Sequence, residues 1–190
     1  MQTNALGGDL SNAIEIRLDD ISQLFETKDP FPFRERDLAT DADAYISGHA
    51  SERPGDLPLE LVVHLPSEAA NVEGVRSLDK SVSNFFTHRA AAVARELGEL
   101  FRAGRRSLAV GLAVLAACLL AGQVLSALTP RGGVAHFIEE GFIIVGWVAL
   151  WRPLEIFLYD WWPLAQKRRL YQRLSEARVT VRFYDQANRL

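Results

Sequence analysis

The sequence has little cysteine and no recognisable catalytic motif. Cys118 is the only cysteine among the 190 residues, so the chain can form neither an internal disulfide nor a cysteine-based metal site. It lies within an apolar run, where cysteine is typical as a small apolar side chain. None of the four histidines pairs with a nearby serine or cysteine in a recognisable catalytic pattern. We therefore expect no catalytic residues, no resident metal and no cofactor.

Lysine is also scarce, because all but three of the 21 basic residues are arginines. This bias is associated with GC-rich bacterial genomes. The charges are unevenly distributed: residues 1–56 carry 12 acidic and 5 basic side chains, whereas residues 160–190 carry 3 acidic and 7 basic ones. Phosphate binding requires concentrated basic residues, so the acidic first part argues against nucleic acid as a partner.

The first residues lack the features of a secretory signal peptide. The segment MQTNALGGDLSNA has neither a basic start nor an apolar stretch. It also has no hydrophobic periodicity, so we expect residues 1–13 to be a flexible N-terminus. Membrane insertion must then be directed by a segment further along the chain.

Two long apolar stretches are present in the middle of the chain. Residues 107–128 contain no charge over 22 positions, enough at 1.5 Å per residue to cross a hydrocarbon core of about 30 Å. The turn-forming segment TPRGG follows, and a second apolar stretch covers about 134–158. The pattern predicts a transmembrane hairpin over residues 105–162.

Basic residues flank both ends of this hairpin. Three arginines lie between residues 102 and 106, and Lys167, Arg168 and Arg169 follow the second span. The connecting loop contains only Arg131. By the positive-inside rule we expect a multi-pass protein of the bacterial inner membrane, with the N- and C-termini in the cytoplasm.

The regions outside the hairpin show the patterns of a small folded domain. Alternation of apolar and polar residues predicts three strands, near 14–18, 59–65 and 178–184. Strands on both sides of the hairpin should join one sheet, because an isolated terminal strand is not stable. The predicted fold is an α+β integral membrane protein, in which the hairpin is inserted into a cytoplasmic α+β domain. Residues 14–104 form most of this domain, and 163–190 complete it with a helix and a strand.

A long amphipathic helix is predicted from Leu78, with apolar residues at three- and four-residue spacing. It either bends at Gly104 or continues straight into the first span. Pro153 predicts that the helix of the second span kinks or ends near Arg152. Residues 154–164 would then lie along the membrane interface.

The sequence offers two groups of candidate site residues, both with weak signals. His136, Glu139 and Glu140 could form an ion or proton site near the start of the second span, or simply lie in water at the outer interface. The second group is interfacial and suggests a charge pair, aromatic anchors and lipid contacts. It comprises Arg152, Glu155, Trp161, Trp162, Lys167, Arg168 and Arg169.

The first span also has a side of small residues, formed by Gly111, Ala116, Ala117 and Ala121. Such a side permits close helix packing, either on the second span or on another subunit. We therefore expect the lipid bilayer as a partner, together with a second copy of the chain or another membrane protein.

Three functions remain open at this point. The first is a non-enzymatic scaffold or accessory subunit of a membrane complex, with a cytoplasmic interaction domain. The second is a small oligomeric channel or transporter, because two spans cannot enclose a pore alone. The third is a lipid-acting enzyme at the inner interface. The first is favoured because the domain is well patterned and has no catalytic constellation.

Overall fold

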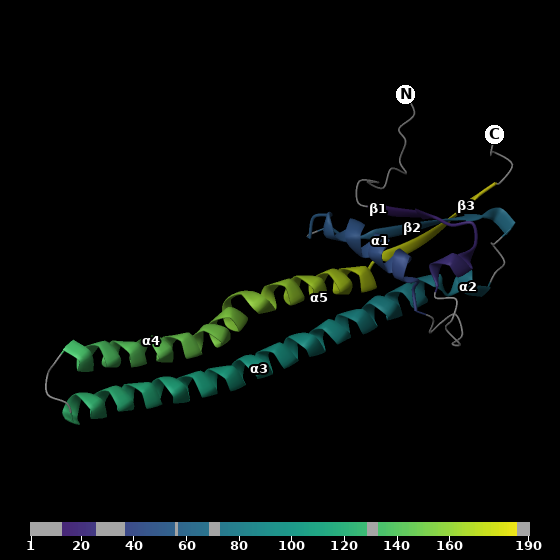
Figure 1. The fold of residues 1–190 in the computed structure, drawn as a ribbon. Helices are drawn as coiled ribbons and strands as arrows, with labels where there is room; N and C mark the ends of the chain where they lie inside the picture. Colours follow the sequence, from purple (N-terminus) through teal and green to yellow (C-terminus); the bar gives the residue numbers. More distant parts are fainter. Residues whose placement is uncertain (1–12, 26–36, 56, 69–72, 129–132, 186–190) are drawn as a thin grey trace. The chain divides into compact units, whose positions relative to one another are not determined.

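The computed structural model describes residues 13–25, 37–55, 57–68, 73–128 and 133–185 (Figure 1). The chain divides into two compact units. Residues 1–92 and 167–190 form the first, which we call the sheet unit, and residues 93–166 form the second, the hairpin unit. The expected flexible N-terminus lies outside the described residues except for Ala13. Residues 129–132 of the predicted loop between the two apolar stretches also lie outside them.

Three parallel strands form the sheet, in the order β1-β2-β3. They are β1 (Ala13–Arg17), β2 (Glu60–Pro66) and β3 (Arg178–Tyr184). This arrangement confirms that strands from both sides of the apolar helices join one sheet. The α+β fold class is likewise confirmed.

The strand order explains why the sheet has one apolar and one polar face. Parallel connections are right-handed in nearly all proteins, so two successive steps in one direction place both connections on the same face. The first connection contains α1 (Thr40–Ser51); the second contains the start of α3 (Leu78–Leu128) and the end of α5 (Trp161–Ser175). In Figure 1 the sheet-proximal ends of α3 and α5 lie on one side of the strands.

The core of the sheet unit lies between this face and the helices. The ring of Phe86 on α3 stacks on Tyr171 of α5, with centroids 6.0 Å apart. Ser83 donates a hydrogen bond of 2.7 Å to the carbonyl of Ser175. Other buried apolar side chains come from the sheet, α1, α3, α5 and the short helix η2 (Ile21–Leu24): Ile14, Ile21, Leu24, Ile46, Leu61, Val63, Leu65, Leu78, Val82 and Leu174.

Two short helices complete the sheet unit. Asp20 caps η2 by accepting a hydrogen bond of 2.7 Å from the Ser22 amide. This bond holds the pKa of the Asp20 carboxyl below its ordinary value of 3.8. The helix α2 (Glu73–Arg76) lies just before α3.

The hairpin unit consists of long helical segments. Helix α3 is continuous over 51 residues, so the chain does not break at Gly104. The returning segment runs through α4 (Gly133–Glu155), the π-helix η4 (Ile156–Asp160) and α5 without a break. Of the two alternatives predicted near Arg152, an end of the helix is therefore wrong, whereas a π-helical turn, which is a recognised cause of kinks, follows Pro153. Pro153 lies inside the helix, and the π-helical turn immediately after it is a type of adjustment by which long apolar helices tolerate proline.

Among the described residues, two helices are long and apolar enough to cross a membrane, one of them α3 and the other running through α4 and α5. Length and composition alone are weak evidence for transmembrane spans. Only 17% of the residues in the most apolar window of each helix are buried within the chain. Core helices of soluble proteins are mostly buried, so these two differ from that class.

Candidate functional site

Helix α3 and the returning helix, formed by α4 and η4, approach each other closely at three glycines. A Cβ atom on Gly104 would lie 2.8 Å from a methyl carbon of Ile156, and one on Gly111 would lie 2.8 Å from the carbonyl oxygen of Ala149. A Cβ atom on Gly146 would lie 2.5 Å from the side chain of Leu115. These distances leave no space for a side chain, so the glycines permit the contact.

The small residues of α3 that face α4 differ in part from those expected. Gly111 is buried as predicted and Ala121 is half-buried, but Ala116 and Ala117 are exposed. The buried positions recur with a seven-residue spacing, which keeps one face of a helix towards a neighbouring helix. They are Gly104, Gly111 and Cys118, with Gly122 one turn further.

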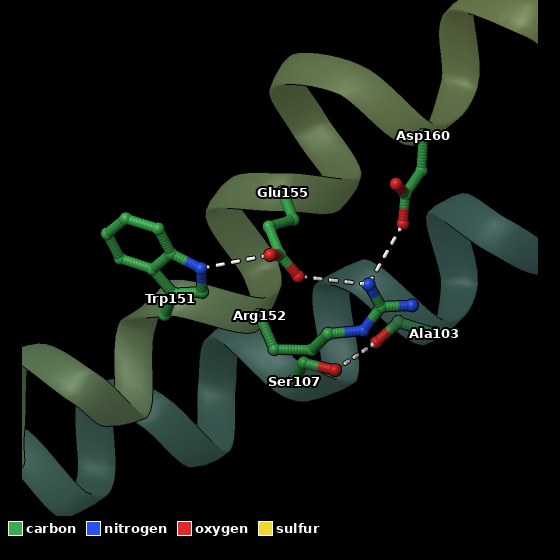
Figure 2. A network of polar contacts seen from close by, with 6 residues as sticks. All are labelled: Ala103, Ser107, Trp151, Arg152, Glu155 and Asp160. Atoms are coloured by element: carbon green, nitrogen blue, oxygen red, sulfur yellow. Dashed lines mark hydrogen bonds and ion pairs between the residues drawn. The ribbon is translucent and has the colours of Figure 1, made fainter.

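A network of polar side chains surrounds Arg152 (Figure 2). The guanidinium Nη1 donates to Oε2 of Glu155 at 3.2 Å and to Oδ2 of Asp160 at 3.0 Å. The indole Nε1 of Trp151 donates to the other carboxylate oxygen of Glu155 at 2.9 Å. The structure thus brings the predicted pair Arg152 and Glu155 together and adds Trp151 and Asp160.

The π-helical turn decides the shape of this network. It begins at Ile156 and ends at Asp160, so the ion pair between Arg152 and Asp160 spans the turn. Trp161 also contributes, because its indole Nε1 donates to the carbonyl oxygen of Phe157 at 2.9 Å. Carbonyl groups in a π-helical turn are displaced from their usual α-helical donors, and the indole supplies a donor there.

The remaining interfacial residues lie next to this network along the chain. The rings of Trp161 and Trp162 pack edge to face with centroids 5.7 Å apart. On the sheet unit, Lys167 Nζ lies 5.9 Å from the ring centroid of Tyr171. Arg168 and Arg169 are exposed on α5. These groups could contact lipid phosphates.

The structure describes the side chains of two of the three candidate site residues near the start of α4. Glu139 is half-buried, with its Cγ 3.5 Å from the position of a Cβ on Gly122, and Glu140 is exposed. The side chain of His136 is outside the described residues. No group of three or more histidines, cysteines or acids that could hold a metal occurs within the described ranges. A carboxylate pair alone is not a metal site.

The sheet unit has a polar face that the strand patterns did not identify as a site. The register places Glu15, Arg17, His64 and Arg182 on this face. Nε2 of His64 lies 3.5 Å from a carboxylate oxygen of Glu15, and the Arg17 guanidinium lies 4.3 Å from the ring centroid of Tyr184. In the sequence, the polar residues that alternate with the apolar ones in each strand could have indicated this face. They define a shared surface only once the register of the strands is known.

A comparison with protein-family models, with curated proteins and with solved structures finds no match to this chain.

Proposed function

We propose that the protein is a non-enzymatic membrane protein, in which the hairpin unit crosses the bilayer and the sheet unit serves as a cytoplasmic interaction domain. The observation that carries this proposal is the exposure of the two apolar helices. Val110, Ile144 and Val148 are all more than 60% exposed on the hairpin unit. Apolar surface of this extent requires cover by lipid or by another membrane protein.

The orientation follows from the charges. Arg102, Arg105 and Arg106 precede the apolar part of α3, and the basic run from Lys167 to Arg169 follows the returning helix. The positive-inside rule then places both termini in the cytoplasm of a bacterial cell. The polar face of the sheet unit is available there for a protein partner, which supports a role as a scaffold or accessory subunit.

The Arg152 network supports an anchoring role in this proposal. Arg152 is paired with two carboxylates, so the cluster has no unmatched positive charge. A lysine or arginine near the end of a span extends towards the interface, and here Asp160 holds Arg152 in that direction. The exposed rings of Trp151 and Trp162 are typical of the headgroup region.

The membrane part of the proposal is tested by cysteine accessibility. In a Cys118→Ala background, Gly132→Cys in the connecting segment and Ser67→Cys in the sheet unit are labelled with a membrane-impermeant maleimide. We expect labelling of the first variant after removal of the outer membrane and of the second only after lysis. Equal labelling of both before lysis would contradict the orientation.

The accessory role is tested by purification of the tagged chain from its native membrane in mild detergent, followed by native mass spectrometry. We expect a stoichiometric membrane-protein partner, in addition to any second copy of the chain. A lone monomer under conditions that preserve known complexes from the same membrane would overturn the role. A closed homo-oligomer that conducts ions in liposomes would favour the channel instead.

A further inference from the structure

The two edges of the sheet differ in what covers their backbone groups. Along an edge strand, every second residue directs its N–H and C=O groups away from the sheet. In β1 the outward carbonyl group of Ala13 accepts a hydrogen bond of 3.1 Å from Arg53. That of Glu15 accepts one of 3.3 Å from the hydroxyl of Tyr45. Side chains from α1 and from the segment after it therefore occupy two positions of this edge.

The edge formed by β3 has no such cover. The N–H group of Arg178 donates to the carbonyl oxygen of Leu59 at 3.1 Å, which fixes the residues of β3 that face β2. By alternation, Val179, Val181 and Phe183 direct their backbone groups outwards. Within the described part of the chain, nothing forms a hydrogen bond with these groups. Such a row of free donors and acceptors is where an extended segment adds to a sheet as a further strand.

The apolar face of the sheet is also open at β3. On β2, Leu61 and Leu65 are buried under the helices, with 1% and 0% of their surface exposed. Their neighbours in register on β3 are Val179, which is half-buried, and Phe183, which is 46% exposed. The helical cover therefore thins out at β3. An added strand would need apolar residues at every second position to continue this face.

The polar face of β3 determines the charge of such a strand. Arg178 and Arg182 are exposed, and β3 contains no acid. Neither arginine forms an ion pair among the described residues, because Glu60, the register partner of Arg178, accepts a hydrogen bond of 2.8 Å from Thr180. Opposite charges on neighbouring strands stabilise their pairing, and like charges destabilise it. The polar positions of the added strand should therefore be acidic.

We propose that β3 is a docking edge for an extended segment of a partner protein, in which apolar and acidic residues alternate. The proposal rests on the role of the sheet unit as an interaction domain, and it names the chemistry of the partner. A second copy of β3 fits this edge less well. In an antiparallel pair centred on Val181, the arginines of both copies would share one face, where their charges repel.

Binding of a short peptide to the full chain in detergent micelles tests the proposal. The probe is a fluorescent peptide of alternating valine and glutamate, seven residues long to match β3, and its anisotropy is followed in a titration. Val181→Pro removes an outward N–H group and no bond to β2, so we expect the dissociation constant to rise about tenfold. The matched control Glu15→Pro, at an outward position of β1, should leave it unchanged.

Reversal of charge gives a second test, which does not depend on the backbone. Arg178→Glu with Arg182→Glu should weaken binding of the glutamate peptide and strengthen binding of a valine–lysine peptide, each by about tenfold. Arg168→Glu with Arg169→Glu changes the net charge equally at exposed positions of α5 and should keep the original preference. Equal binding of both peptides to the unaltered chain, or unchanged binding by Val181→Pro, would overturn the proposal.

Purification from the native membrane separates this proposal from the one on which it rests. Loss of the partner from Val181→Pro and from the charge-reversed chain, but not from Glu15→Pro, supports the docking edge. A partner that stays with the first two variants refutes the edge and leaves the interaction domain intact, whereas an unaltered chain without any partner refutes both. A disulfide dimer of Val181→Cys chains in a Cys118→Ala background would place a second copy at this edge and refute the acidic partner.

Discussion

At the scale of single residues, the helices of the hairpin unit pack closely at positions where a glycine leaves no side chain between the two backbones. The carbonyl group of Ala149 cannot receive the usual helical hydrogen bond, because Pro153 has no N–H group four residues later. This carbonyl faces Gly111, because its oxygen lies 2.8 Å from the position of a Cβ on that residue. The proline and the glycine are therefore coupled across the two helices.

Substitution of Gly111 by alanine should destabilise the hairpin unit. The new Cβ would lie 2.8 Å from the Ala149 oxygen, a backbone atom that cannot move alone, and overpacking of this kind costs about 1–3 kcal/mol. Gly141→Ala is the matched control, because nothing lies within 4 Å of its Cβ position. Thermal unfolding in detergent micelles measures both. An unchanged melting temperature for Gly111→Ala would show that the helices are further apart.

Asp43 in α1 of the sheet unit is a buried acid, with 8% of its surface exposed. Its Oδ2 accepts a bond of 2.8 Å from Arg89, which joins α1 to α3. The other oxygen is buried without a hydrogen-bond partner among the described residues. The attraction between Asp43 and Arg89 therefore offsets only part of the cost of removing the Asp43 carboxylate from water. The net contribution of the ion pair to the free energy of unfolding is modest.

The substitution Asp43→Asn should lower the free energy of unfolding by about 1 kcal/mol, because Arg89 is half-exposed and retains much of its hydration. Asp41→Asn is the control. Both acids lie in the first turn of α1 and lose the same interaction with the helix dipole, but Asp41 is exposed. Denaturant titration followed by circular dichroism compares the two. Equal losses would mean that the ion pair contributes nothing beyond the dipole.

At the scale of elements, the sequence patterns predicted the strands and long helices well. Period-two alternation placed β3 at Arg178–Tyr184, as observed, because a half-buried strand must alternate. The π-helix could not be predicted, since its apolar residues fit an α-helix equally well. Asp160 was missed for the same reason: it lies eight residues from Arg152, a spacing at which α-helical side chains do not normally pair.

The side chain of Arg173 joins helix α5 to the segment before β2. Arg173 donates to the carbonyl oxygens of Pro54 and Leu57 at 2.6 and 3.2 Å. Arg173→Gln should weaken this attachment by about 1 kcal/mol, which corresponds to about fivefold faster amide exchange in residues 52–59. Arg169→Gln, at an exposed position of the same helix, should have no effect there. Similar exchange in the two variants would show that other contacts hold the segment.

At the scale of the whole molecule, the hairpin is an insertion between two neighbouring strands. β2 lies in the middle of the sheet, and β3 covers its far edge only after about 110 residues of helical chain. Backbone groups along β2 then have partners on both sides, from Leu61 with Val179 to Leu65 with Phe183. The sheet unit is therefore complete only when the chain has returned from the apolar helices.

Removal of residues 178–190 should unfold the sheet unit while leaving the hairpin in the membrane. Without β3, the buried strand β2 becomes an edge with unpaired backbone groups, and two parallel strands alone are not stable. The two apolar helices, which direct insertion in the proposed topology, remain. We expect limited proteolysis in inverted membrane vesicles to cleave within residues 13–92 in the truncated chain. A chain that lacks only residues 186–190 keeps all of β3 and should remain resistant. Resistance of the longer truncation would mean that β1, β2 and the helices form a stable core by themselves, and that β3 is an addition to it.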